Sequence, residues 1–150
     1  MKTINKQAEN MGGVVRIWAI PQMDYSLSGE TLTITSDTNM VEIYLQEDSG
    51  EFTENPIEGS AFKTEIVGTV PCDNPTTLSY IRELERKLKW NVIYQDGNGN
   101  FKLAGTKSVP LRFDAKLATG GSASALNHYE ISFLAKVIKE RAVFINDPFV

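Results

Sequence analysis

The sequence predicts a mainly β fold with one α-helix: an antiparallel two-sheet sandwich or a small barrel with the helix on one flank. Apolar and polar residues alternate over many short segments, as in half-buried strands. One segment in the middle of the chain switches to helical spacing. The chain has 150 residues, of which 41% are hydrophobic and 23% charged. This is enough for one domain with a hydrophobic core.

The first half of the chain contains four expected strands. Residues 14–20 are apolar on both faces, which indicates a central strand covered on each side. Residues 31–35, 41–45 and 62–70 alternate, so each segment should bury one face. The acidic residues 47–58 are expected to form a solvated loop, because glycine and proline interrupt them.

The predicted helix covers about residues 75–89. Asn74 is a good N-cap, and Pro75 suits the first helical position, where a missing N–H matters least. We expect the apolar stripe to pack on a sheet. This stripe consists of Leu78, Ile81, Leu84 and Leu88.

After the helix the period returns to two. Trp90, Val92 and Tyr94 alternate, and the Asp-Gly-Asn-Gly turn at residues 96–99 predicts a hairpin with the residues that follow. Residues 109–117 and 129–137 are two long expected strands. The glycine-containing residues 118–126 between them are expected to be flexible.

The chain divides into three expected regions: a flexible N-terminal arm (residues 1–13), the β domain (14–138) and an apolar C-terminal tail (139–150). Within the tail, we expect residues 143–145 to pair as a final strand of the same domain. Phe149 and Val150 are apolar end residues, and we expect them to contact a partner.

Composition excludes several classes of protein. The net charge of −4 argues against general nucleic-acid binding, which requires Lys and Arg. No segment has the length of apolar sequence that spans a membrane, and the N-terminus lacks the apolar core of a signal peptide. We therefore expect synthesis in the cytoplasm. Cys72 is the single cysteine, so the chain forms no internal disulfide.

The charges are unevenly distributed. Six acids and no base lie between Glu42 and Glu58, whereas eight bases and four acids lie between Arg82 and Lys116. Such asymmetry could dock one subunit head to tail on the next. Ordinary solvated loops and a solvated helix face are the alternative explanation of each cluster.

Chemical motifs are scarce, and we predict no catalytic residue, metal site or cofactor. Asp96, Asn98 and Asn100 have the spacing of a calcium loop, but the required later Gly and Glu are absent. His128 and Cys72 could act as base and nucleophile, yet no local motif supports either residue. An enzyme is therefore the third hypothesis for function, after the two below.

The second half of the chain resembles small prophage-encoded tail proteins of the tail-tube kind. The resemblance rests on the helix NPTTLSYIRELERKL, the hairpin WNVIYQDGNGNFKLAG, VPLRF, a glycine-containing loop, NHYEISF and an apolar tail. It implies a virion structural protein whose subunits form rings stacked around a DNA channel. It also implies homo-oligomers, other tail proteins as partners and no catalysis.

The resemblance assigns roles to two groups of residues. The loop with Gly120 and Gly121 and the N-terminal arm would be contacts between rings, and an acidic surface would line the channel and repel DNA. That surface would comprise Glu47, Asp48, Glu51, Glu54 and Glu58. The alternative function is a monomeric β-sandwich module that binds carbohydrate or a protein, with exposed aromatics sought at Trp18, Tyr25 and Trp90.

Overall fold

The computed structural model describes residues 1–4, 11–121 and 127–150 of the chain. Within these residues it contains eleven strands, one α-helix and one short 3-10 helix, so the predicted mainly β class with one helix is confirmed. The elements in chain order are β1 Val14–Ile20, η1 Gln22–Asp24, β2 Tyr25–Ser28, β3 Thr31–Ile34, β4 Val41–Tyr44, β5 Glu51–Ile57, β6 Ala61–Val70, α1 Pro75–Lys87, β7 Lys89–Asp96, β8 Phe101–Ala104, β9 Leu111–Ala118, β10 His128–Ile138 and β11 Val143–Ile145.

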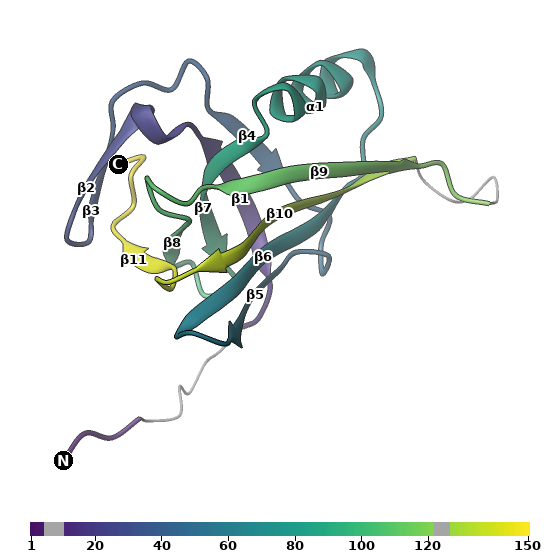
Figure 1. The fold of residues 1–150 in the computed structure, drawn as a ribbon. Helices are drawn as coiled ribbons and strands as arrows, with labels where there is room; N and C mark the ends of the chain where they lie inside the picture. The colour runs from purple at the N-terminus through teal and green to yellow at the C-terminus, as the bar shows by residue number, and fades with distance from the viewer. Residues whose placement is uncertain (5–10, 122–126) are drawn as a thin grey trace.

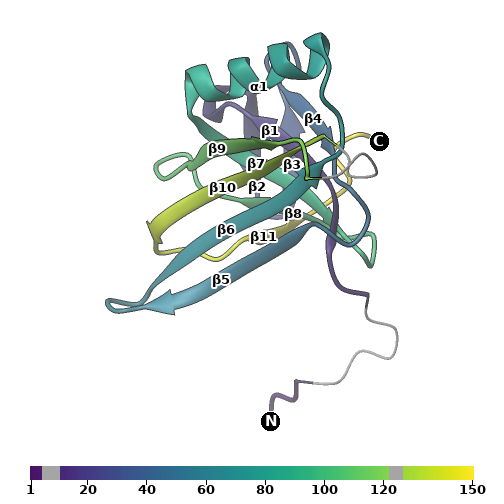
Figure 2. The same cartoon turned by 90° about the vertical axis from the view of Figure 1, so that its right-hand side faces the viewer.

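The strands form a sandwich-like arrangement folded from one antiparallel sheet. One layer has the order β4-β1-β7-β8-β11, and the other has the order β9-β10-β6-β5. We call them the five-stranded and the four-stranded layer. They join where the first residues of β7 pair with the first residues of β9. Helix α1 lies across one end of the sandwich, and the separate hairpin β2-β3 lies beside the five-stranded layer (Figures 1 and 2).

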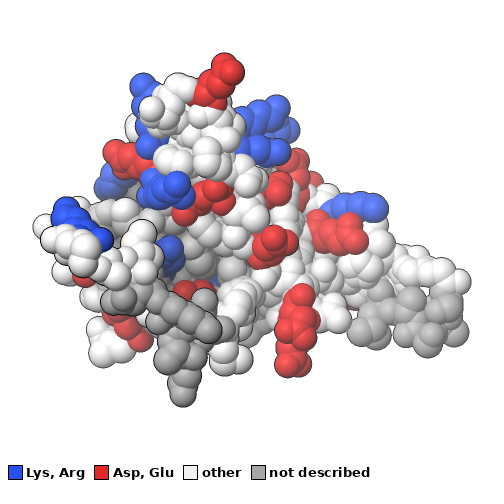
Figure 3. Space-filling model, turned by 90° about the horizontal axis from the view of Figure 1, so that it is seen from below, with Lys and Arg blue, Asp and Glu red and all other residues white. Residues whose placement is uncertain are grey.

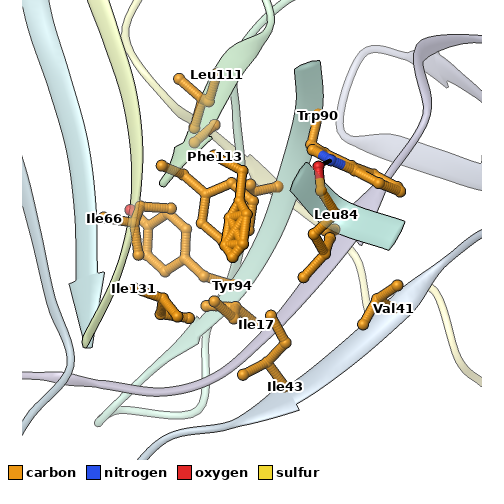
Figure 4. Close-up of a cluster of buried hydrophobic side chains, with 14 of the residues drawn as sticks. Ile17, Val41, Ile43, Ile66, Leu84, Trp90, Tyr94, Leu111, Phe113 and Ile131 are labelled. Carbon is orange, nitrogen blue, oxygen red and sulfur yellow. Dashed lines mark hydrogen bonds between the residues drawn. The ribbon is translucent and has the colours of Figure 1, made fainter. Parts of the chain in front are cut away.

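The main core lies between the two layers and beneath α1. Its centre is a stacked pair of rings from the four-stranded layer, Phe113 and Phe133, whose centroids are 5.1 Å apart. Trp90 is fully buried and donates its indole N–H to the carbonyl oxygen of Leu84 at 3.0 Å, which fastens α1 to β7 (Figure 4). Burial of these large side chains is the main stabilising contribution in this region.

A second core lies on the opposite face of the five-stranded layer. Trp18, Ile20 and Ile93 point to this face and are covered by Tyr25 and by neighbouring apolar residues. Residues of β1 therefore pack on both sides of the layer. The prediction that residues 14–20 form a central strand covered on each face is confirmed.

Helix α1 begins and ends through local backbone chemistry. The Asn74 side chain accepts a hydrogen bond from the Thr77 N–H at 2.8 Å, and Pro75 is the first helical residue, as predicted. The helix ends at Lys87, two residues earlier than expected, because Leu88 adopts a φ of 62° and its N–H bonds to Leu84. Leu88 is consequently exposed rather than part of the buried stripe.

The prediction of a solvated loop over residues 47–58 is wrong for most of this segment. Seven of these residues form β5, which pairs along its whole length with β6. The acidic composition and Pro56 conceal this strand in the sequence. Both are tolerated because β5 is an edge strand, whose outer side faces solvent.

The C-terminal segment belongs to the sheet. β11 pairs with β8, so the expected pairing of residues 143–145 within the domain is confirmed. Ile145 is buried in the second core. No helix among the described residues is long and apolar enough to cross a membrane.

Candidate assembly interface

The four-stranded layer ends in two strands with a free side. β5 pairs only with β6 among the described strands. β9 pairs with β10 on one side, and on the other side only its first two residues meet β7. The Phe113 N–H donates to the Leu88 carbonyl at 2.8 Å, so residues 114–118 have one side without a partner among the described residues. Such edges present backbone N–H and C=O groups that can pair with another chain.

The exposed charged residues of β5 and of the turn that follows it are acidic. Glu51 and Glu58 are exposed, and neither forms an ion pair with the residues that the structure describes. Figure 3 views the molecule from the side on which β5 lies in Figure 1, and acidic side chains gather over the middle of this face.

Glu54 differs from its acidic neighbours because it points into the sandwich. Its side chain is only 11% exposed, and one carboxylate oxygen lies 3.8 Å from a guanidinium nitrogen of Arg141. Arg141 also lies over the ring of Phe62, with 4.1 Å between guanidinium carbon and ring centroid. The pair therefore closes the side of the sandwich where β5 and β11 approach each other.

The end of the layer at β9 is basic. Lys89 and Arg112 are directly opposite each other across the β7–β9 pair, and like charges in this position repel. Arg82 and Arg86 on the exposed side of α1 add two more cations. Over the described residues, none of these four side chains forms an ion pair. This end therefore has positive charge available for an external anion.

The five acids that the sequence groups together do not form one surface. Glu47 and Asp48 lie in the turn after β4, Glu51 lies on the outer face of the four-stranded layer, and Glu54 points inward. The outer face also carries a base: its hollow is lined by Lys116 together with Asp114, Glu130 and Ser132. The face is polar and of mixed charge.

The N-terminal segment enters the domain through a narrow passage between two turns. The Met11 N–H bonds to the Asn98 side chain at 2.7 Å, the Gly97 N–H to the Gly13 carbonyl at 3.1 Å, and the Val14 N–H to the Gly50 carbonyl at 3.0 Å. A Cβ atom on Gly97 would lie 2.5 Å from the Gly12 carbonyl oxygen. Sequence reasoning missed this passage, because it depends on pairs of glycines distant in the chain.

Residues 1–4 are exposed and lie apart from the sandwich (Figures 1 and 2). Residues 5–10 of the arm expected to be flexible lie outside the described residues, as do residues 122–126 of the loop between β9 and β10. Gly120 has a φ of 78°, and a Cβ atom added to Gly121 would meet no atom within 4 Å.

Phe149 makes contacts within its own chain. Its ring centroid lies 4.6 Å from that of Trp18 and 6.1 Å from that of Phe101, and its side chain is still 44% exposed. Val150 is fully exposed. Phe149 therefore contacts the second core and keeps part of its ring exposed.

The aromatics considered for sugar binding are mostly buried. Trp18, Tyr25 and Trp90 are at most 3% exposed, so they do not form a surface platform.

Two other tyrosines differ in their surroundings. Burial raises the pKa of Tyr94, with the charge of Glu54 as a further cause. Tyr44 is exposed, and its ring lies 4.5 Å from the guanidinium of Arg16.

Arg16 also pairs with Glu42 on the neighbouring strand. Burial opposes ionisation of Glu42, but hydrogen bonds from Arg16 and nearby groups hold the pKa of this carboxyl below its usual value. Arg16 lies over the rings of both Trp18 and Tyr44. The cluster fixes the surface of β1 and β4 by packing and charge.

The candidate nucleophile and base have other partners. The Cys72 sulfur accepts hydrogen bonds from Asn74 at 3.0 Å and Thr77 at 3.3 Å, while a ring nitrogen of His128 lies 3.4 Å from Glu130. Within the described residues, no three His, Cys, Asp or Glu side chains are arranged to hold a metal ion.

Comparison with known proteins gives no significant match to a family model, to a curated protein or to a solved structure.

Proposed function

We propose that this protein is a structural subunit of a phage or prophage tail, of the tail-tube kind, that assembles head to tail and has no catalytic role. The observation that carries the proposal is the pair of free strands at opposite ends of the four-stranded layer. One end is acidic and the other is basic. A virion is the location that this role implies, after synthesis in the cytoplasm.

The two edges suit a contact between different surfaces of successive copies. Residues 114–118 of β9 offer a free side of similar length to the first residues of β5, before Pro56 removes a donor. Pairing β5 of one copy with β9 of the next would continue the four-stranded layer from subunit to subunit. A contact of this kind closes into a ring when its rotation allows, and otherwise grows into a helical filament.

Charge supports this pairing and its direction. Glu51 on β5 would approach the cations at the β9 end, which include Lys89 and Arg112. A copy presented in the reverse direction would bring acid to acid or base to base. Complementary charge of this kind selects the partner and its orientation more than it adds affinity.

The N-terminal arm supports assembly in a second direction. The glycine passage around Gly13 and Gly50 sets where the arm leaves the domain. Residues 1–4 are exposed and available to another copy or to another tail protein. Segments that order on binding commonly wrap a neighbouring subunit.

The test is native mass by light scattering over a range of concentrations, with negative-stain images of the same fractions. The wild type should form a ring, stacked rings or a filament. Glu51→Lys should weaken assembly by placing a cation opposite the basic end, and Glu30→Lys is its control because it makes the same change of charge on the β2–β3 turn. A wild type that stays monomeric at every concentration, or a Glu51→Lys variant that assembles like the control, contradicts the proposed contact.

The alternative function, a monomeric β-sandwich binding module, predicts a strict monomer. Its sugar-binding form also requires aromatic side chains at the surface, whereas Trp18, Tyr25 and Trp90 are buried. A protein-binding form needs no such platform. The same light-scattering experiment distinguishes the two functions.

A further inference from the structure

The turn between β7 and β8 carries a dipeptide that favours a chemical change without an enzyme. Asn98 is followed by Gly99, and no other asparagine of the chain precedes a glycine. Glycine has no Cβ atom, so its backbone nitrogen is sterically open. Such a nitrogen can attack the side-chain amide carbon of the asparagine before it. For this reason an asparagine loses its side-chain amide most readily when glycine follows it.

The structure places this dipeptide where solvent reaches it. Asn98 and Gly99 are both exposed, and a Cβ atom added to Gly99 would meet no atom within 4 Å. In the same hairpin, Asn91 is completely buried, and Asn100 is exposed but precedes Phe101. Of these three asparagines, Asn98 alone combines exposure with a following glycine.

The same turn holds the N-terminal segment. The Asn98 side-chain oxygen accepts the Met11 N–H at 2.7 Å, and the neighbouring Gly97 N–H donates to the Gly13 carbonyl at 3.1 Å. A Cβ atom on Gly97 would lie 2.5 Å from the Gly12 carbonyl oxygen, so the two segments are in close contact. Any change in the length of the turn backbone therefore displaces the atoms that form these bonds.

We propose that Asn98 is a site of spontaneous deamidation, and that its isoaspartate product releases the N-terminal segment from the turn. The Gly99 nitrogen forms a bond with the side-chain carbon of Asn98. The bond from that carbon to the side-chain nitrogen breaks, and ammonia leaves with the proton of the Gly99 nitrogen. Water then opens the cyclic imide at one of its two carbonyl carbons. One opening gives aspartate, and the other gives isoaspartate, in which the main chain runs through the former side chain.

Isoaspartate changes both the backbone and the charge of the passage. It lengthens the main chain by one carbon atom, which moves the oxygen that accepts the Met11 N–H. It also replaces a neutral amide by a carboxylate. The cavity beside Asn98 already has an acidic lining, with three acids and one base: Asp48, Glu51, Asp96 and Lys102. The added charge therefore meets mostly like charges, which repel it.

The native bonds restrain this reaction. The Gly99 N–H donates to the Asp96 carbonyl at 3.1 Å, while Met11 holds the Asn98 side chain. Both bonds must open before the Gly99 nitrogen reaches the side-chain carbon. Exposed turns open at a lower free-energy cost than core strands. Deamidation of the native chain should therefore be slow, and removal of the Met11 bond should accelerate it.

The first experiment incubates the full chain in warm, mildly alkaline buffer and follows it by mass spectrometry. Trypsin releases residues 90–102, a fragment that contains Asn91, Asn98 and Asn100. The mass of this fragment should rise, and its fragment ions should place the change at Asn98. Isomerisation of Asp96, which also precedes a glycine, leaves the mass unchanged. An unmodified Asn98, or equal deamidation of Asn100, overturns the proposal.

The second experiment tests the restraint with Met11→Pro, because proline has no N–H to donate to Asn98. Deamidation of Asn98 should become about five times faster, the factor that corresponds to one lost hydrogen bond. Met11→Ala is the matched control, since it keeps the N–H and removes only an exposed side chain. Equal rates in the two variants contradict the restraint by this bond.

The third experiment measures release of the segment by amide hydrogen exchange. In the isoaspartate product, the Gly97 N–H should exchange about five times faster, because opening no longer breaks the Met11 bond as well. Asn98→Asp is the control: it adds the same charge but keeps the length of the main chain and an oxygen acceptor. Exchange of Gly97 that is unchanged in the isoaspartate product overturns the release. Neither this measurement nor the mass depends on assembly, so both results are independent of the light-scattering test.

Discussion

Gly50→Ala tests whether the N-terminal segment is held by close backbone approach. A Cβ on Gly50 would lie 2.9 Å from a methyl carbon of Leu45 and closer still to the carbonyl oxygen of Val14. Nonbonded carbon contacts are favourable near roughly 3.5 Å, so the two chain segments must separate by about 1 Å. This movement breaks the 3.0 Å hydrogen bond from the Val14 N–H to the Gly50 carbonyl.

The magnitude follows from these two effects. Overpacking costs about 1–3 kcal/mol and the lost hydrogen bond about 1 kcal/mol, so the free energy of unfolding should fall by about 2–4 kcal/mol. A chain of this size should then lose roughly 5–15 °C in Tm. Urea unfolding followed by tryptophan fluorescence measures the change, because both tryptophans are buried.

The matched control is Gly12→Ala in the same segment. A Cβ at Gly12 meets no atom within 4 Å, and the residue needs no positive φ. Its free energy of unfolding should stay within about 0.5 kcal/mol of the wild type. A Gly50→Ala variant as stable as Gly12→Ala would refute the close approach at Gly50.

Three further predictions concern single side chains. Asn74→Ala should lower the free energy of unfolding, measured by urea titration, by about 1 kcal/mol because the Thr77 N–H loses its cap. Asn74→Ser should retain most of the wild-type stability, because serine also caps helices. Equal losses in the two variants would contradict the capping role. Burial raises the pKa of Tyr94, so above the unfolded-state value of about 10 the unfolded chain loses the phenolic proton first and stability falls as pH rises. Tyr94→Phe should reduce this fall in the free energy of unfolding above pH 10. An unchanged dependence of stability on pH would contradict the role of Tyr94. Phe149→Ala should expose the Trp18 indole and shift tryptophan emission to longer wavelength; an unshifted spectrum would show that Phe149 does not cover Trp18.

Elements set by neighbouring residues could be predicted from the sequence. Asn74 and Pro75 act within one turn of the helix, and their chemistry locates its start. The turn at residues 96–99 is equally local, since Gly99 supplies a φ of 84° and the Asp96 carboxylate accepts the N–H groups of Asn98 and Asn100. The hairpin of β7 and β8 follows from that turn and from the alternating residues around it.

Elements set by distant pairing were missed or misread. The sequence of β5 contains acids, an asparagine and a proline, which are poor strand formers. It is a strand because β6 offers it a complete row of backbone partners. The same pairing turns Glu54 toward Arg141 and away from the acidic surface to which the sequence assigned it.

For this protein, the sequence by itself determined the mainly β class, the central position of β1 and the start of α1, because periodicity and capping act over a few residues. Tertiary structure alone decided which strands are left with a free side, where the charges gather and which glycines let two segments touch. Gly50 and Val14, or β4 and α1, are distant in the chain and become neighbours only when the sheet folds. Free strand edges and close backbone contacts depend on such neighbours, and a single sequence carries no local signal of them.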